Sequence, residues 1–205
     1  MTLIDLTRLL LDDTPVFPGD SAMTLKQTRN LDEDGYCNHE LTINMHTGTH
    51  IDGPMHMTDS RTFISDMPLE RFVGKGCVLD VSGQREIDFK PEYETIVEEN
   101  VILLLHTGHG ELFGQPQYFT DYPVLTERFA EWLVRKKVKM VGFDTPSPDK
   151  DPYAVHLTFM NHGILIAENL TNLDRLLQTR SFEVFALPLR IRADASMARV
   201  IARFA

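Results

Sequence analysis

The segment from residue 46 to residue 56 of this 205-residue chain reads HTGTHIDGPMH, which places three imidazoles and one carboxylate close together. His46, His50, Asp52 and His56 all occupy even positions. On extended backbone, where successive side chains alternate between faces, such residues point the same way. The segment therefore predicts a metal site on one face of a strand.

A helical geometry is the alternative, because His46 and His50 have the i, i+4 spacing by which two helical histidines share one ion. Gly48 and the pair Gly53-Pro54 disfavour it, since proline alone costs about 3 kcal/mol inside a helix. Four residues of straight strand span roughly 13 Å, whereas zinc–nitrogen bonds are about 2.0–2.1 Å. His46 and His50 can therefore share an ion only if the chain turns between them, and Gly48 permits that turn.

Length and composition indicate one globular domain over residues 1–205. The chain is 42% hydrophobic and 24% charged, which is typical of globular proteins. The net charge of −10 disfavours a nucleic-acid partner, and no apolar run approaches the roughly 20 residues that span a bilayer. Cys37 and Cys77 have no CxxC spacing and fit reduced thiols. We therefore expect a cytoplasmic protein with neither nucleic acid nor membrane as a partner.

Hydrophobic periodicity predicts a mixed α/β architecture. Strands are expected at 3–7, 22–29, 39–46, 77–81, 101–105, 139–143, 163–167, 183–191 and 198–204, and helices at 66–72, 91–99, 124–137 and 153–161. The alternation of helix and strand after the first third predicts a partly parallel sheet with covering helices. Strand 39–46 is expected to be half-buried, with Leu41, Ile43 and Met45 on the face opposite His46.

Two further candidates lie far downstream of the motif. Glu168 ends the apolar run Gly-Ile-Leu-Ile-Ala-Glu, and His156 lies in the segment Tyr-Ala-Val-His-Leu-Thr-Phe. A carboxylate placed directly after a buried strand loses hydration energy unless it is paired or coordinated. Spacing alone does not connect these two residues to the motif.

Taken together, these segments resemble the cyclase family, which includes bacterial kynurenine formamidase and isatin hydrolase. The resemblance covers nearly the whole chain. It rests on the start Leu-Ile-Asp-Leu-Thr followed by Val-Phe-Pro-Gly-Asp, the block at 46–56, the pair Thr107-Gly108, the segment Gly-Phe-Asp-x-x-Ser-x-Asp at 142–149, and the His156–Glu168 spacing. The first block is the most specific of these.

The resemblance implies a swivelling β/β/α fold, a homodimer or homotetramer, and two divalent ions, zinc or manganese, in each subunit. It implies that the first ion is held by His46, His50 and Asp52. Asp52 would bridge to a second ion held by His156 and Glu168, and His56 would act as the acid/base. In such a centre, hydroxide generated from metal-activated water attacks an amide carbon and the histidine returns a proton to the amine.

The expected function is therefore metal-dependent hydrolysis of a carbon–nitrogen amide bond, with N-formylkynurenine as the best single substrate. Two alternatives stay open at this point. One is opening of a cyclic amide or lactone, as in isatin, and the other is a protein that binds metal or a small ligand without turnover.

Two departures from the family concern the substrate pocket. Gly53 stands where many members have Ala, and His109 stands where many have Trp. Loss of that Trp would remove an aromatic platform, which other aromatic side chains can replace, namely Phe17, Phe63, Phe113, Tyr118 or Phe119. Thr107-Gly108 is either a strand-ending turn or part of the pocket wall. The histidines outside the proposed site are expected to be structural or exposed: His39, His106, His109 and His162.

Overall fold

The centre of the fold is a sheet of eight strands. The computed structural model describes residues 1–179 and 181–204. Four neighbouring strands run parallel, namely β5 (Val73–Asp80), β7 (Ile102–His106), β9 (Met140–Phe143) and β10 (Leu165–Glu168). The antiparallel members are β1 (Thr2–Asp5), β4 (His50–Asp52), β11 (Phe182–Pro188) and β12 (Ala195–Phe204).

Strand β4 closes this sheet into a barrel-like arrangement, because it pairs with β10 on one side and with β12 on the other. The order along the sheet is β1-β12-β11-β5-β7-β9-β10-β4. The mixed sheet expected from the sequence is confirmed, and its four parallel strands correspond to the strands predicted at 77–81, 101–105, 139–143 and 163–167.

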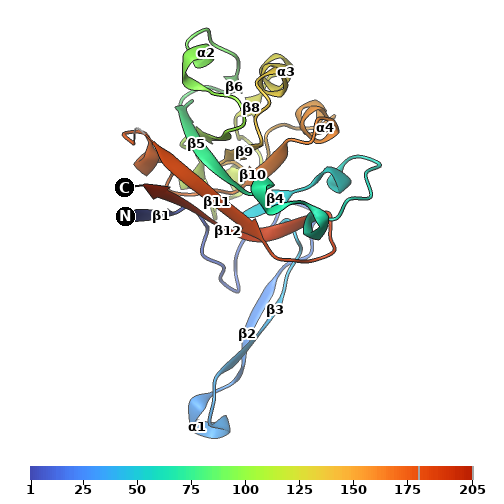
Figure 1. Ribbon diagram of the computed structural model, residues 1–205. Helices are drawn as coiled ribbons and strands as arrows, with labels where there is room; N and C mark the ends of the chain where they lie inside the picture. The colour runs from blue at the N-terminus through green and yellow to red at the C-terminus, as the bar shows by residue number, and fades with distance from the viewer. Residues whose placement is uncertain (180, 205) are drawn as a thin grey trace.

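Helices cover one face of the parallel strands, as Figure 1 shows for α2 (Tyr93–Ile96), α3 (Glu127–Arg135) and α4 (Ala154–Asn161). Strand alternation separates two cores. Leu103 and Leu105 belong to the core under the helices, whereas Ile102 and Leu104 belong to the core inside the barrel. All four of these β7 side chains are almost fully buried, which explains the uninterrupted apolar sequence of the strand.

Three predicted helices are shorter than expected. Residues 124–125 pair as strand β8 (Val124–Leu125) with β6 (Glu86–Ile87), so α3 begins only after Thr126, whose hydroxyl accepts a hydrogen bond from the Phe129 amide. The helix predicted at 91–99 is the single turn α2. The segment 66–72 forms 3₁₀ turns on either side of Pro68, which cannot donate a helical hydrogen bond.

Short 3₁₀ helices connect the larger elements. They are η1 (Pro54–His56), η2 (Ile64–Asp66), η3 (Leu69–Arg71), η4 (His109–Leu112), η5 (Pro116–Phe119) and η6 (Leu173–Leu176). No helix in the described residues is long and apolar enough to cross a bilayer.

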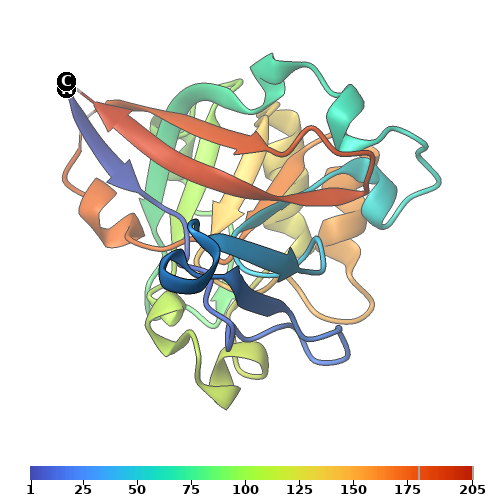
Figure 2. The same ribbon diagram turned by 90° about the horizontal axis from the view of Figure 1, so that it is seen from below.

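A two-stranded arm projects from the body (Figure 1), and Figure 2 views the molecule from the side of this arm. It consists of β2 (Thr24–Arg29), the short helix α1 (Leu31–Asp34) and β3 (Asn38–Thr42). The half-buried strand predicted at 39–46 is wrong, because every residue of β3 is exposed and the strand ends at Thr42. Alternation shows only that one face of a strand is more apolar, and within the described residues no second layer covers that face.

Candidate metal centre

The motif folds as a turn followed by a strand. Gly48 has φ +66°, a left-handed conformation that glycine adopts without a steric penalty. This turn brings the rings of His46 and His50 to 5.0 Å between centroids, although four residues separate them in sequence. The bend that a shared ion requires is therefore present, and the helical alternative is excluded.

Strand pairing brings the downstream carboxylate to the motif. In the antiparallel ladder between β4 and β10, Glu168 lies directly opposite His50, and Ile166 lies opposite Asp52. His156 approaches from the first turn of α4. These side chains meet at the carboxyl end of the parallel strand β10, the edge where open α/β sheets usually bind ligands.

The separations between donor atoms fit a shared ion. The Nε2 atom of His50 lies 3.3 Å from Oδ1 of Asp52 and 3.4 Å from Oε2 of Glu168. The Nε2 atom of His156 lies 3.5 Å from Oε1 of Glu168. A tetrahedral ion with bonds of about 2.1 Å holds its ligand atoms about 3.4 Å apart. The spacing is thus wide for direct hydrogen bonds but suited to common coordination.

Three buried atoms in this group have no hydrogen-bond partner, namely His50 Nε2, Asp52 Oδ1 and Glu168 Oε1. An unpartnered polar atom in a protein interior is costly, by about 1–3 kcal/mol, and more for a charged group. Their convergence at one point is the observation that best fits a bound cation. Asp52 belongs to two candidate ligand groups, His46–Asp52–His56 and His50–Asp52–Glu168. These groups differ from the expected sets, because His56 is in the first and His156 is in neither.

The second nitrogen of each candidate histidine ligand has its own acceptor. His50 Nδ1 lies 2.9 Å from the Gly48 carbonyl oxygen, and His156 Nδ1 lies 2.5 Å from Oδ1 of Asp149. His46 Nε2 lies 2.9 Å from Oδ2 of Asp194. Such outer contacts fix which nitrogen faces a metal. They leave His46 Nδ1, His50 Nε2 and His156 Nε2 directed at Asp52 and Glu168.

The neighbouring carboxylates shift the proton affinities of these histidines. Burial alone would lower the pKa of His46, but its close contacts with the Asp52 and Asp194 carboxylates outweigh burial and raise that pKa to about 10. Burial likewise opposes Asp149 and Glu168 at His156, whose pKa is also raised to about 10. Although burial would raise the pKa of Asp52, the adjacent histidines hold it well below its usual value.

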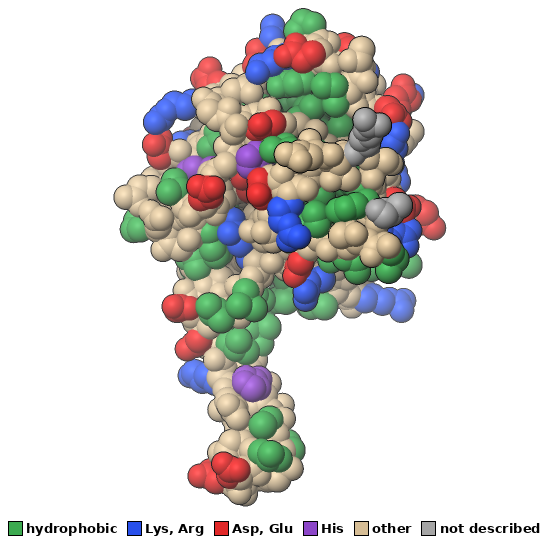
Figure 3. All heavy atoms as spheres, turned by 90° about the vertical axis from the view of Figure 1, so that its left-hand side faces the viewer, with side chains coloured by type: hydrophobic (Ala, Val, Ile, Leu, Met, Phe, Trp, Pro, Cys, Tyr) green, Lys and Arg blue, Asp and Glu red, His purple; other side chains and the backbone are tan. Residues whose placement is uncertain are grey.

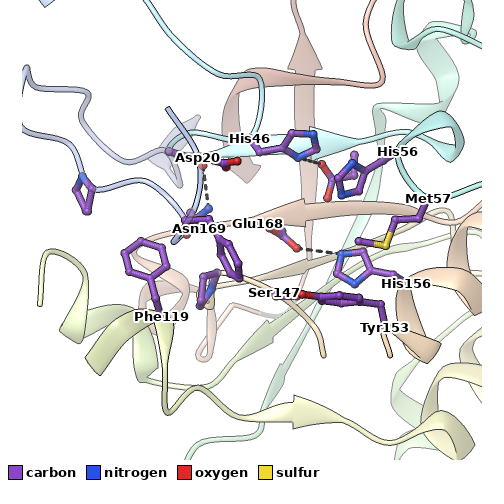
Figure 4. A pocket seen from close by; sticks show the side chains of 15 residues that line it. Asp20, His46, His56, Met57, Phe119, Ser147, Tyr153, His156, Glu168 and Asn169 are labelled. Atoms are coloured by element: carbon purple, nitrogen blue, oxygen red, sulfur yellow. Dashed lines mark hydrogen bonds and ion pairs between the residues drawn. The ribbon is translucent and has the colours of Figure 1, made fainter. Parts of the chain in front are cut away.

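His56 stands at the edge of a pocket next to these residues (Figure 4). Its side chain is 25% exposed, and its ring lies 6.1 Å from that of His156. Phe17 and Phe119 also line the pocket, and their rings meet edge to face at 6.0 Å. These two side chains therefore form an aromatic part of the pocket wall.

The other aromatic candidates lie elsewhere. Phe113 packs under Arg8, Phe63 packs under Arg192, and the Tyr118 hydroxyl donates to Oδ1 of Asn169 inside the protein.

The pair Thr107-Gly108 acts as a strand-ending turn. The amides of Thr107 and Gly108 donate to the carboxylate of Asp144, at 2.9 Å and 3.0 Å. His109 is buried beside this turn, where its ring stacks on Tyr118 and its Nε2 lies 2.9 Å from the Tyr118 carbonyl oxygen. His109 therefore fills an interior position and does not replace an aromatic residue at the pocket rim.

Two carboxylates in contact with the site were missed as functional candidates. Asp149 lies in the segment 142–149 that resembles the cyclase family, but no sequence signal links it to His156. Asp194 lies 138 residues beyond His56 and follows no motif. The pairing of Ala195 with Asp52 across β12 and β4 brings Asp194 to the histidines, which local spacing in the sequence does not show.

Comparison with known proteins identifies the family. Residues 4–150 match the model of the family described as "Putative cyclase". The chain is 33% identical over 206 residues to the kynurenine formamidase of Bacillus cytotoxicus, covering 98% of this chain and 96% of that protein. It is 34% identical over 208 residues to the kynurenine formamidase of a Bacillus cereus strain, again covering 98% and 96%. The chain therefore belongs to the cyclase family.

Solved structures share the fold. Isatin hydrolase A from Ralstonia solanacearum superposes with a TM-score of 0.88 at 21% identity, over 98% of this chain and 91% of that one. A structure from Bacillus stearothermophilus, described as a predicted metal-dependent hydrolase, superposes with a TM-score of 0.80 at 23% identity, over 98% and 97%. At these identities the likeness establishes the arrangement of the elements.

The raised pKa values of His46 and His156 predict that the metal-free protein loses stability as pH rises. Both groups gain protons more readily in the folded state than in the unfolded chain, whose histidine pKa is 6.5. Their contribution is complete below pH 6.5 and is lost as pH approaches 10. Thermal unfolding in chelator from pH 6.5 to 10 should therefore show a falling midpoint. The double variant His46→Gln, His156→Gln should lose much of this slope, and an unchanged slope would contradict the assignment.

Proposed function

We propose that the protein is a metal-dependent hydrolase that cleaves a carbon–nitrogen amide bond, with N-formylkynurenine as its best substrate and residues 1–205 acting as one domain. The observation that carries the proposal is the convergence of unpartnered buried donor atoms from β4 and β10. The near full-length similarity to enzymes named kynurenine formamidase supports the choice of amide substrate.

The candidate ligands divide into two sets that share Asp52. Zinc or manganese fits imidazole and carboxylate donors of this kind. Bound at such a site, divalent ions polarise a carbonyl and lower the pKa of water towards neutrality. The first set is His46 Nδ1, His50 Nε2 and Asp52; the second is Asp52, His156 Nε2 and Glu168.

His56 is proposed to move the proton. Its Nδ1 lies 3.2 Å from the Asp194 carboxylate, so Nε2 is the nitrogen left for substrate. From the pocket edge, Nε2 can accept a proton from water and return it to the departing nitrogen. That return matters because an amine leaves poorly from an amide unless it is protonated.

The pocket walls suit an aryl amide. Phe17 and Phe119 offer perpendicular rings, and Tyr153 lines the same pocket beside the candidate ligands. Aromatic side chains hold planar rings through edge-to-face and offset contacts. The anthranilic ring of N-formylkynurenine is a substrate group of this type.

Removal and return of metal tests the proposal directly. Hydrolysis of N-formylkynurenine is measured by the appearance of kynurenine. Exhaustive chelation should abolish this activity, and added Zn²⁺ or Mn²⁺ should restore it. The physical reason is that removal of the ion also removes the group that would lower the pKa of water and polarise the amide carbonyl. Undiminished turnover in protein shown by elemental analysis to be free of metal would overturn the proposal.

Opening of a cyclic amide is the second candidate reaction, since the same aromatic walls accept the planar ring of isatin. A panel containing N-formylkynurenine, isatin and a simple lactone separates the reactions by kcat/KM. We expect the formamide to exceed isatin by at least about tenfold, a difference of roughly 1.4 kcal/mol in transition-state binding. The opposite ranking would favour ring opening.

The variant His56→Ala distinguishes an enzyme from a binding protein. It should retain metal, because His46, His50 and Asp52 remain as the first proposed ligand set, and it should lose about 10²–10⁴-fold in kcat, the usual range for acid/base help. Metal content by elemental analysis and turnover are measured on the same sample. Loss of metal would make His56 a ligand, and unchanged kcat would remove its proton-transfer role.

The protein is also proposed to form a homodimer or homotetramer in which the β2–β3 arm packs against a second copy. An isolated two-stranded hairpin is marginal in water. Figure 3 shows the arm standing clear of the body, and Leu31, Tyr36 and Leu41 on it are 65%, 55% and 42% exposed. Light scattering should give a multiple of 23.4 kDa, and Leu31→Glu with Leu41→Glu should lower it. A wild-type mass of one chain would contradict this assembly.

A further inference from the structure

Asp194 joins two imidazoles that have different proposed tasks. A single oxygen, Oδ2, lies 2.9 Å from Nε2 of His46 and 3.2 Å from Nδ1 of His56. The two rings lie almost face to face, with centroids 4.1 Å apart and planes inclined by 36°. One carboxylate oxygen has two lone-pair directions and accepts from both rings at once.

These contacts determine which nitrogen of each ring carries the proton. A carboxylate acceptor favours N–H on the nitrogen that faces it, and the other nitrogen is then a free base or a metal donor. On His46 the other nitrogen is Nδ1, which lies 2.9 Å from Oδ1 of Asp52, a proposed metal ligand, and is therefore the nitrogen directed at an ion. On His56 it is Nε2. Asp194 thus selects the ligand atom of one histidine and the basic atom of the other.

The backbone holds Asp194 in this position. The Gly53 amide donates to the Asp194 carbonyl oxygen at 2.9 Å, and the Ile64 amide donates to the Ala193 carbonyl oxygen at 2.9 Å. A Cβ atom on Gly53 would stand only 2.9 Å from the same Asp194 oxygen, so the two segments are in close contact. The next residue, Ala195, is paired with Asp52 in the sheet.

We propose that Asp194 is a positioning residue that orients His46 for metal and His56 for proton transfer through one shared oxygen. The part of this proposal that concerns His56 rests on the proposed function. The part that concerns metal affinity does not. The carboxylate side chain is 35% exposed, so it is not needed to fill the core, and its replacement should leave the fold intact. The effect of replacing Asp194 should appear in the orientation of the His46 and His56 rings.

The variant Asp194→Asn tests the proposal, because it keeps the shape of the side chain and removes its charge and one acceptor oxygen. Zinc affinity, measured by competition with a chromophoric chelator, should fall by about 10–100-fold, the usual effect of losing an outer-sphere partner. At saturating zinc, kcat should stay at least tenfold below wild type, since His56 remains misoriented. The thermal midpoint of the metal-free variant reports whether the fold is retained.

A spectroscopic measurement separates orientation from activity. In zinc-loaded protein with ¹⁵N-labelled histidine, NMR should show His56 protonated at Nδ1 in wild type and redistributed towards Nε2 in Asp194→Asn. Asp149→Asn removes the carboxylate at His156, so it should weaken zinc binding without changing the His56 signal. Asp80 and His106 form an equivalent pair outside the site, with Oδ1 and Nδ1 3.2 Å apart. The control variant Asp80→Asn should change neither the zinc affinity nor the His56 signal.

The outcomes separate the hypotheses. Unchanged zinc affinity together with an unchanged His56 tautomer in Asp194→Asn would overturn the proposal. Weakened zinc binding with full recovery of kcat and an unchanged tautomer would confine Asp194 to His46 and overturn its shared role. If the wild-type protein hydrolyses no amide, the proposed function fails, but zinc affinity and the tautomer still decide the role of Asp194.

Discussion

The short strand β4 is the element on which the site depends. It has only three residues, yet it pairs with β10 on one side and β12 on the other. These two ladders place Glu168 opposite His50 and Ala195 opposite Asp52, so segments separated by more than a hundred residues meet at one edge of the barrel-like sheet. A shift of one position in either ladder would turn the facing side chains to the opposite face. The register of β4 therefore determines whether the ligand set exists.

Charge explains why the residues that this register brings together suit a cation. Buried carboxylates and imidazoles are stable only when each atom finds a partner. The outer nitrogens of the histidines find partners in Gly48, Asp149 and Asp194, but the inner atoms of His50, Asp52 and Glu168 do not. In the metal-free protein, raised histidine pKa values offset part of this cost. An ion bound here would displace those protons, so its affinity would depend on pH.

The arrangement also assigns different environments to chemically similar residues. His46 and His56 share one carboxylate oxygen, but His46 points its remaining nitrogen at Asp52 whereas His56 stands at the pocket edge. Aromatic residues also differ in environment, since Phe17 and Phe119 line the pocket whereas Tyr118 is buried and its hydroxyl is hydrogen-bonded inside the protein. Residue type alone does not distinguish these roles.

The sequence by itself determined the mixed α/β class and the bend at Gly48, because these depend on local periodicity and on backbone freedom. It also identified the cyclase family, which the comparisons confirm. The block at 46–56 made this possible, because its closely spaced histidines and aspartate form a specific motif. Tertiary structure alone decided that β3 belongs to a projecting arm, because alternation cannot show whether another layer covers a strand. It alone brought Asp149 and Asp194 to the histidines, since strand register and helix placement link residues that no local spacing connects.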